Sequence, residues 1–282
     1  MWAIIGGTGF ENFEGFNTIE ELERETPFGL TSIGFKKVSL DGKEALFIPR
    51  HGAYHDRLPS EVNYRANIYA LKKQGATKLL GFSAVGSLAA ECVPGDLVIP
   101  NQFIDRTKGL RERSYCGDGI VGHVSLAEPV TECFVEELKN KKDTFEFKTH
   151  FDKTLVVMEG PQFSTKAESH LYRSWKADII GMTSYPEFAL AREAGLAYMN
   201  CCFVTDYDCW KDDIPHVTVD EVMRVMKKNN QKAYHVAKAM LHSSNEIVQN
   251  ASELKNGLGS ALMTPMASLK PEQAKWISTI LS

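Results

Sequence analysis

The chain has 282 residues, of which 43% are hydrophobic and 24% are charged, a composition typical of a soluble globular protein with a sizeable core. Its 32 Lys and Arg residues against 36 Asp and Glu give a net charge of −4, which excludes the broad basic surface of nucleic-acid-binding or membrane-binding proteins. No apolar run is long enough to span a bilayer, and the first residues lack the basic region and the long apolar run of a signal peptide, so we expect none. The six cysteines lack a CxxC pair, so we expect reduced thiols in a cytoplasmic protein.

Predicted strands and helices alternate along the chain. In order, they are strands at 2–5, 36–40 and 43–48, a helix at 59–76, strands at 77–85 and 95–100, a helix at 133–142, a strand at 153–160, a helix at 164–175, a strand at 177–183, a helix at 185–195, a strand at 196–204, and helices at 217–241 and 267–282. This alternation predicts an α/β fold with a largely parallel sheet, and the lack of a linker predicts one domain over 1–282.

Capping signals indicate where several helices begin and end. The signals are Ser60 and Gly75 for the helix 59–76, the capping box Thr165 with Glu168, Pro186 and Gly195 for the helix 185–195, and the capping box Thr218 with Glu221. The segment 107–122 is polar and glycine-rich, so we expect a surface loop that serves as a lid or a subunit contact.

Glycine, hydroxyl and basic residues collect where the predicted strands end, and open α/β sheets bind ligands there. The glycines of GGTG let the backbone approach a ligand, and the Thr8 hydroxyl can donate to an oxyanion; the alternative is a tight turn without a ligand. The third glycine of a dinucleotide fingerprint would fall on Asn12, which disfavours an NAD-dependent dehydrogenase. Arg50 in PRHG is a natural bidentate partner of phosphate, unless it is a surface residue beside a structural histidine.

Three further motifs admit both a structural and a functional interpretation. His51 and His55 have metal-like spacing, but a glycine follows His51 and no third ligand is evident, so we expect no metal site. The Ser83 hydroxyl in SAVGS lines a ligand site or belongs to a close-packed strand end. In EGPQFST, Phe163 can stack on a planar ligand, and Ser164 can line a pocket beside the helix cap.

Two aspartates, Asp206 and Asp208, follow the apolar run 195–204. Residues two apart in an extended chain point to the same side, so we expect both carboxylates at the mouth of a buried strand. A buried carboxylate beside a second one has a raised pKa and can donate a proton to a departing nitrogen. The alternative is an Asx-turn or a helix cap. Together, the expected oxyanion site, the apolar and aromatic side chains and the acid pair fit one kind of substrate. It has a sugar carbon that phosphate attacks and a planar basic ring that leaves.

The motifs EGPQFSTKAES, IIGMT, PEFALAREAG and VTDYDCW, after GGTGF, PRHG and NYRANIYALK, resemble the trimeric purine nucleoside phosphorylases, and more closely the 5′-methylthioadenosine phosphorylases. The resemblance covers about residues 1–240 and leaves about 250–282 as a helical extension. It implies a mixed, partly barrel-like, twisted sheet flanked by helices, and a homotrimer or a dimer of trimers. It also implies phosphorolysis of an N-glycosidic bond, with inorganic phosphate as co-substrate and no metal or organic cofactor.

The resemblance implies a role for each candidate site residue. The implied phosphate site comprises Thr8, Arg50, His51, Ser83, the backbone of Ala84, and Thr183, although relatives have Thr at position 83. The implied nucleoside contacts are Met182 under the ribose, Phe163 near the base or sugar, Asp206 at purine N7 and Asp208 at the 6-amino group. The remaining roles are specificity at Ser164 and Val219, a methylthio pocket at Val219 and Val222, and closure of that pocket by His123 of a neighbouring subunit.

The expected reaction converts S-methyl-5′-thioadenosine and phosphate into adenine and 5-methylthioribose 1-phosphate. A carboxylate accepts from a 6-amino group but repels a 6-oxo group, a mismatch that costs about 1–3 kcal/mol. Phosphorolysis of a 6-oxopurine nucleoside or of methylthioinosine is therefore the less favoured alternative. A nucleoside hydrolase would leave Arg50 and Thr183 unexplained, and a non-catalytic nucleotide- or sugar-phosphate-binding module would leave the acid pair unexplained.

Overall fold

The computed structural model describes residues 1–282 apart from 12, 14 and 212–218, and at 219–223 it describes the backbone alone. The strands are β1 (Trp2–Gly6), β2 (Asn17–Glu21), β3 (Glu25–Thr26), β4 (Gly29–Leu30), β5 (Lys36–Leu40), β6 (Lys43–Pro49), β7 (Lys78–Ser87), β8 (Leu97–Arg106), β9 (Thr149–Met158), β10 (Ile179–Gly181) and β11 (Ala197–Asp206). The α-helices are α1 (Tyr64–Lys73), α2 (Glu132–Lys141), α3 (Lys166–Ser174), α4 (Ser184–Glu193), α5 (Val219–Leu241), α6 (Glu246–Gln249), α7 (Leu258–Ala261) and α8 (Pro271–Leu281).

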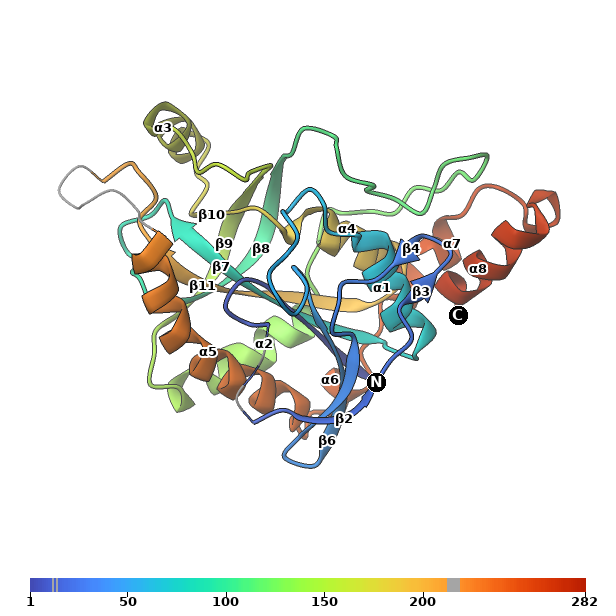
Figure 1. Ribbon diagram of the computed structural model, residues 1–282, viewed down its shortest axis with the longest axis horizontal. Helices are drawn as coiled ribbons and strands as arrows, with labels where there is room; N and C mark the ends of the chain where they lie inside the picture. The colour runs from blue at the N-terminus through green and yellow to red at the C-terminus, as the bar shows by residue number, and fades with distance from the viewer. Residues whose placement is uncertain (12, 14, 212–218) are drawn as a thin grey trace.

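Nine of the strands form one mixed sheet in the order β10-β9-β8-β11-β7-β1-β6-β5-β2, with helices around it (Figure 1). Along one part of the sheet, β7 pairs in parallel with β11, β11 antiparallel with β8, and β8 and β10 each in parallel with β9. β10 then pairs antiparallel with β7, through Ile179 with Ser87 and Ile180 with Gly86, so these strands close into a ring. This arrangement confirms the expected mixed α/β fold with a partly barrel-like sheet.

The central strand β1 separates two apolar cores. Trp2 and Ile4 pack in a cluster with side chains of α2 and α5, whereas Ala3 and Ile5 pack in a cluster with α1, α4 and α8. Because both faces of this strand are covered, all five of its residues are buried, which explains its continuous apolar sequence. The polar side chains that follow such strands are therefore placed by a rigid apolar frame.

The helix predicted at 59–76 is present, but Ser60 does not cap it. The chain makes a turn at Leu58–Glu61, and α1 begins only at Tyr64. Asn63 is the cap instead, because its side chain accepts the backbone N–H of Ala66. Gly75 does follow the helix with a left-handed φ of 82°, as predicted from its sequence position.

Some of the other predicted helix and strand boundaries agree with the structure, and others do not. The capping box of Thr165 with Glu168 is confirmed at the start of α3. The strand predicted at 95–100 continues to Arg106, because its second half pairs with β9 outside the apolar run. The second capping box includes Thr218, which lies outside the described residues. The C-terminal helix α8 begins at Pro271, and treating about 250–282 as an extension of the domain stays a prediction.

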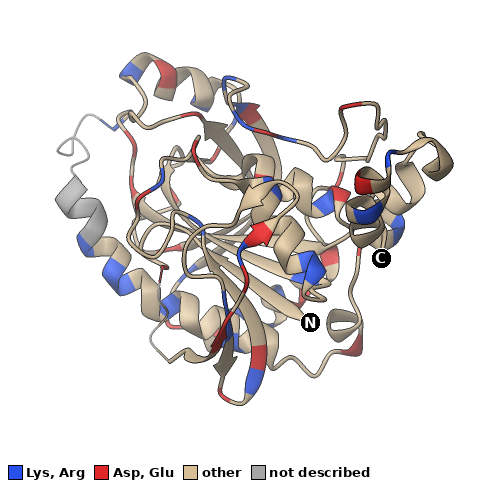
Figure 2. Ribbon diagram, turned by 45° about the vertical axis from the view of Figure 1, so that its right-hand side comes forward, with Lys and Arg blue, Asp and Glu red and all other residues tan. Residues whose placement is uncertain are grey.

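The segment 107–122 forms a loop that contains an isolated bridge between Gly117 and Ile120. Figure 2 shows Lys and Arg residues interspersed with Asp and Glu residues over the helices and loops of this view. Among the described residues, no helix is both long enough and apolar enough to cross a membrane.

Candidate active site

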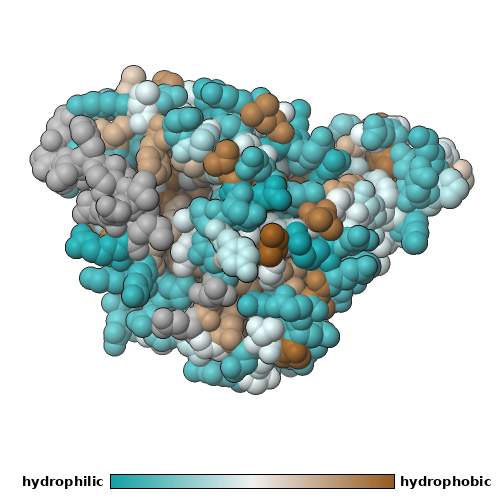
Figure 3. Space-filling model, viewed as in Figure 1, coloured by the Kyte–Doolittle hydropathy of each residue, from teal (hydrophilic) through white to brown (hydrophobic). Residues whose placement is uncertain are grey.

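A cavity of about 950 Å³ lies at the carboxyl ends of β1, β6, β7, β9, β10 and β11. On the face seen in Figure 3, apolar side chains are visible in a hollow beside hydrophilic ones. The predicted site residues that line the cavity are Thr8, Arg50, His51, Ser83, Ala84, Phe163, Ser164, Met182, Thr183, Asp206 and Asp208. The fold thus brings together residues from both ends of the predicted domain.

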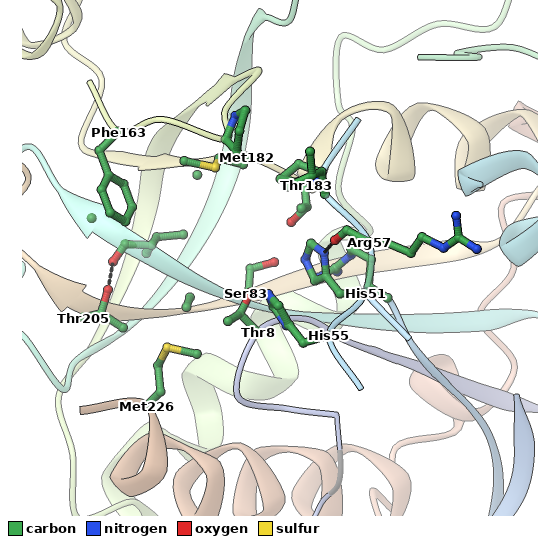
Figure 4. A pocket seen from close by; sticks show the side chains of 18 of the residues that line it. Thr8, His51, His55, Arg57, Ser83, Phe163, Met182, Thr183, Thr205 and Met226 are labelled. Atoms are coloured by element: carbon green, nitrogen blue, oxygen red, sulfur yellow. Dashed lines mark hydrogen bonds between the residues drawn. The ribbon is translucent and has the colours of Figure 1, made fainter. Parts of the chain in front are cut away.

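Three hydroxyl groups and an imidazole lie toward one side of this cavity (Figure 4). They belong to Thr8, Ser83, Thr183 and His51. Thr183 precedes α4, but its side chain makes no capping hydrogen bond, so its hydroxyl is available to a ligand. Ser83 donates to Asn200 over 3.3 Å, and its oxygen lone pairs stay available. We call this group of residues the oxyanion corner.

Arg50 lies behind the oxyanion corner and is fully buried. Its Nε and Nη2 donate to Glu187 over 2.6 and 2.9 Å, and its Nη1 donates to the Phe82 carbonyl over 3.1 Å. Burial alone would lower the pKa of Arg50, but the charge and hydrogen bonds of Glu187 raise it, so the guanidinium stays charged. Arg50 therefore does not bind phosphate in a bidentate manner through Nε and Nη2, because Glu187 occupies that edge of the guanidinium.

His51 is neutral in this environment. Burial, and secondly the charge of Arg50, lower its pKa to about 4. Its Nδ1 lies 2.8 Å from the Arg57 carbonyl, which can only accept, so Nδ1 has the hydrogen and Nε2 is an acceptor. The ring stacks on His55, with 4.7 Å between the centroids, and His55 in turn contacts Glu11.

Asp206 and Asp208 both line the opposite side of the cavity, but strand alternation does not place them there. β11 ends at Asp206, and Asp208 has a left-handed φ of 50°. The backbone N–H of Asp208 donates to Asp206 Oδ1 over 2.8 Å, which is the geometry of an Asx-turn. The Asx-turn, which was the structural alternative, is therefore present, and both aspartates also line the cavity. Asp206 Oδ2 also lies 2.6 Å from the Thr205 hydroxyl.

The carboxyl group of Asp208 is buried and has a raised pKa. Burial is the largest cause, and the hydroxyl of Ser164 opposes it by favouring the charged form. Ser164 donates to Asp208 Oδ1 over 3.2 Å, and it lines the cavity, as expected for one of its two interpretations. The negative charge of Glu168 raises the pKa further.

Apolar side chains line the rest of the cavity. Figure 4 shows Phe163, Met182 and Met226 on the side away from His51. Met226 lies on α5, seven residues after Val219 and four after Val222, so all three positions share one helix face. The side chains of Val219 and Val222 lie outside the described residues, and their predicted pocket is not tested.

His123 lies elsewhere on the chain. Its backbone N–H donates to the Ala261 carbonyl, and its side chain is exposed beside a second, polar cavity near Arg192 and Glu253. His123 does not line the first cavity of its own chain. Its predicted contact with the site of a neighbouring subunit stays a prediction.

Several residues of the site were not found by sequence reasoning. Glu187 neutralises Arg50, Thr205 contacts Asp206, and Met226 lines the apolar side. The spacing from Val222 to Met226 on a predicted helix would have indicated the last of these, whereas no local signal marks Glu187. Across the ranges that the structure describes, no three His, Cys, Asp or Glu side chains are grouped to hold a metal ion.

Known proteins are similar to this chain in sequence and in structure. The model of a family described as the phosphorylase superfamily matches residues 2–242. The S-methyl-5′-thioadenosine phosphorylase of Geobacter sulfurreducens is 40% identical over 279 residues, which cover 99% of this chain and 97% of that protein.

Two solved structures are similar over most of the chain. The crystal structure of a methylthioadenosine phosphorylase from an Antarctic soil metagenomic library gives a TM-score of 0.91 at 40% identity, covering 100% of this chain and 98% of that one. The methylthioadenosine phosphorylase of Schistosoma mansoni in complex with adenine gives a TM-score of 0.80 at 35% identity, covering 88% of this chain and 94% of that one.

Proposed function

The chain belongs to the phosphorylase superfamily, and we propose that it cleaves S-methyl-5′-thioadenosine with inorganic phosphate to give adenine and 5-methylthioribose 1-phosphate. The observation that supports this most directly is the single cavity that joins the oxyanion corner to the pair Asp206 and Asp208. Phosphate then matches the oxyanion corner, and the purine base matches the side of the two aspartates.

Phosphate occupies the oxyanion corner. Thr8 and Thr183 donate their hydroxyl hydrogens to it. Ala84, which also lines the cavity, contributes its backbone. Arg50 has five N–H hydrogens, of which three are used by Glu187 and Phe82, so a remaining Nη hydrogen is available for a phosphate oxygen. Neutral His51 accepts the hydroxyl hydrogen of hydrogen phosphate at Nε2.

The reaction passes through a ribooxocarbenium-like transition state. The bond from C1′ to N9 breaks, and its electron pair goes to the purine, which takes a proton at N7 from Asp206. A phosphate oxygen, fixed below C1′, stabilises the positive sugar and then forms the new bond. General-acid assistance of this kind contributes about 10²–10⁴-fold to the rate.

The hydrogen bonds around Thr205 support Asp206 as the acid. The Thr205 hydroxyl lies 3.1 Å from the Val85 carbonyl and 2.6 Å from Asp206 Oδ2, but it has one hydrogen. When that hydrogen goes to the carbonyl, the short contact to Asp206 needs a hydrogen from the carboxyl group. Thr205 can thus accept from Asp206 in its acid form and donate to it once the proton has left.

Asp208 recognises the 6-amino group of adenine. An ionised carboxylate accepts from the amine, whereas it repels the oxygen of a 6-oxopurine. Ser164 fixes the orientation of this carboxylate. Phosphorolysis of a 6-oxopurine nucleoside is the second candidate, and the experiment below distinguishes the two.

The apolar side of the cavity takes the sugar and the methylthio group. Met182 lies under the ribose and Phe163 near the base or sugar, as in the expected family pattern. Met226 lies on the same helix face as Val219 and Val222 and lines the cavity. It therefore continues the apolar surface that faces the methylthio group. A thioether in this position needs an apolar surface and no hydrogen-bond donor.

The reaction needs neither metal nor organic cofactor, because the phosphate stabilises the sugar cation and Asp206 neutralises the leaving purine. We further propose a cytoplasmic homotrimer, or a pair of trimers, in which His123 closes the methylthio pocket of the neighbouring subunit. Exposed apolar residues near His123 support a subunit contact there: Val121 is 47% exposed and Met263 is 68% exposed.

The first experiment measures free base from methylthioadenosine, adenosine, inosine and methylthioinosine, each with and without phosphate. Phosphate-dependent adenine release, fastest from methylthioadenosine, is the expected result. Hypoxanthine release with inert adenine nucleosides would contradict the role of Asp208. Phosphate-independent release would indicate a hydrolase, and binding without release of any base would indicate a non-catalytic module.

A further inference from the structure

The loop 107–122 inserts one buried arginine behind the cavity. The side chain of Arg111 is 1% exposed, although its neighbour Leu110 is 71% exposed. Its Nη1 donates to the carbonyls of Met182 and Tyr185 over 2.7 and 2.6 Å. Its Nε and Nη2 donate to the side chain and the carbonyl of Glu159 over 2.8 and 3.0 Å.

These acceptors belong to two segments that form the nucleoside side of the cavity. Met182 lies between β10 and α4, and Tyr185 is the second residue of α4; this segment includes the predicted ribose contact and Thr183. Glu159 follows β9 directly, and the chain from there runs through Gly160 to Phe163 and Ser164. Arg111 therefore joins the floor under the ribose to the segment that reaches the base.

The two segments are also packed closely against each other. A Cβ on Gly160 would lie 2.6 Å from the Met182 sulfur, and Gly160 has a left-handed φ of 72°, so this position favours glycine. The carboxylate of Glu159 accepts a second hydrogen bond, over 2.6 Å, from the backbone N–H of Lys108. The loop is thus attached to the β9 end by both its backbone and its arginine.

We propose that Arg111 is a positioning residue for the nucleoside: it fixes Met182 and the segment 160–164 at the separation that the ribose and the base require. This inference rests on the proposed function, and Arg111 itself contacts neither substrate. The planar guanidinium is suited to this place because its donors point along several fixed directions at once. A lysine ammonium has no such fork and cannot reproduce the four contacts.

The geometry predicts which kinetic constant depends on Arg111. Three of the four residues of the oxyanion corner lie on or after β1, β6 and β7, none of which provides an acceptor for Arg111. Only Thr183 lies beside Met182. A misplaced ribose floor therefore affects the nucleoside more than phosphate. Displacements of about 1 Å at a reacting centre cost up to about 10²-fold in rate.

The test is steady-state kinetics of Arg111→Ala and Arg111→Lys, with methylthioadenosine and phosphate varied separately. We expect kcat/KM for the nucleoside to fall about 10²-fold, while the KM for phosphate stays within a factor of about three. Millimolar guanidinium should restore part of the activity of Arg111→Ala, by filling the space of the lost side chain. Arg111→Lys should not recover the wild-type value.

The matched control is Arg192→Ala. Arg192 is also buried, lies on α4, and pairs with Glu253 over 3.0 Å, but it does not line the cavity. We expect it to lower the melting temperature without changing either KM selectively. If Arg111→Ala gave wild-type constants, or raised the KM for the nucleoside and the KM for phosphate by the same factor, the positioning role would be wrong.

Two further measurements apply if the Arg111→Ala variant does not fold or if the wild-type protein is inactive. If Arg111→Ala does not fold, Glu159→Gln removes the charge and the Lys108 acceptor while keeping the side-chain shape, and should show the same selective loss to a smaller degree. If the wild type releases no base, the proposed function fails. Calorimetry with adenine and with phosphate then tests Arg111: selective weakening of adenine binding supports the positioning role, and equal weakening overturns it.

Discussion

Arg50 and Glu187 form a buried bidentate ion pair behind the oxyanion corner, with Nε to Oε2 at 2.6 Å and Nη2 to Oε1 at 2.9 Å. Both side chains are almost fully inaccessible to water. Because the two charges cancel, Arg50 orients hydrogen-bond donors more than it attracts phosphate by net charge. Tyr198 donates a further hydrogen bond to Glu187 over 3.1 Å, which fixes the carboxylate.

The variant Glu187→Gln tests this relationship. Breaking one side of a buried pair costs about 3–5 kcal/mol, so we expect a large fall in the melting temperature in phosphate-free buffer. The uncompensated Arg50 should then bind phosphate more tightly, and phosphate should raise the melting temperature more than it does in the wild type. Thermal unfolding with and without phosphate measures both effects. Glu137→Gln is the control, because Glu137 is also buried and accepts hydrogen bonds from Ser243 and Asn245, away from the cavity.

The oxyanion corner could be predicted because Thr8, His51 and Thr183 follow strands and Ser83 lies in the second half of one. The strands of an α/β sheet deliver such residues to one edge. Glu187 could not be predicted. It lies in the helical pattern PEFALAREAG, where a glutamate usually faces water, and only the closed barrel brings that helix against Arg50. Arg111 was missed for the same reason: a polar loop predicts a surface, and the burial of this arginine depends on acceptors that are distant in the sequence.

The acid pair was predicted correctly as a pair lining one cavity, but the local geometry was not. An extended strand would place Asp206 and Asp208 side by side, whereas the strand ends and an Asx-turn begins. The competition between strand and turn depends on the register of β11 against β7, which shifts between Val204 and Asp206. Sequence spacing alone does not contain that register.

The variant Asp206→Asn separates the turn from the acid. An asparagine Oδ1 can still accept the N–H of Asp208, so the loop should keep its conformation. Its amide cannot deliver a proton to N7, and we expect kcat for methylthioadenosine to fall about 10²–10⁴-fold. Turnover and melting temperature should be measured together. Near-normal turnover in a folded Asp206→Asn would exclude the acid role, and Thr205→Val should show a smaller loss in the same direction.

The variant Asp208→Asn tests base recognition. An amide can donate to a 6-oxo group, so preference should shift from the adenine nucleoside toward methylthioinosine by about 10–100-fold. The ratio of kcat/KM for the two substrates is the measurement. An unchanged ratio would show that the 6-position is recognised elsewhere.

Asp208→Asn should also stabilise the protein at neutral pH. The folded-state pKa of Asp208 is raised, chiefly by burial, so the folded chain binds a proton more readily than the unfolded chain does. The associated stability is present below the ordinary Asp pKa and is lost as the pH rises through the folded pKa. Neutral asparagine removes this loss, and the melting temperature at pH 7 should rise. A lower melting temperature would mean that the ionised carboxylate is needed for the local structure.

His51 makes the opposite contribution to the pH dependence of stability. Its folded-state pKa is about 4, against 6.5 for an ordinary histidine, because of burial and then of Arg50. Between these values the unfolded chain binds a proton that the folded chain does not, so stability falls as the pH is lowered through this window, by about 3 kcal/mol in total. Above pH 6.5 the contribution is complete. Phosphate affinity, because it involves neutral His51, should show no titration of this ring between pH 6.5 and 8.

Denaturant unfolding at several pH values between 4 and 7, in phosphate-free buffer, measures this slope. His51→Gln keeps a hydrogen-bonding side chain but cannot be protonated, so its unfolding free energy should depend less on pH than that of the wild type. His242→Gln is the control for loss of an imidazole, since His242 contacts the Leu40 carbonyl outside the cavity. If His51→Gln retained the full wild-type slope, the buried neutral imidazole would not be its source. The acid sensitivity of the fold would then have to come from the carboxylates instead.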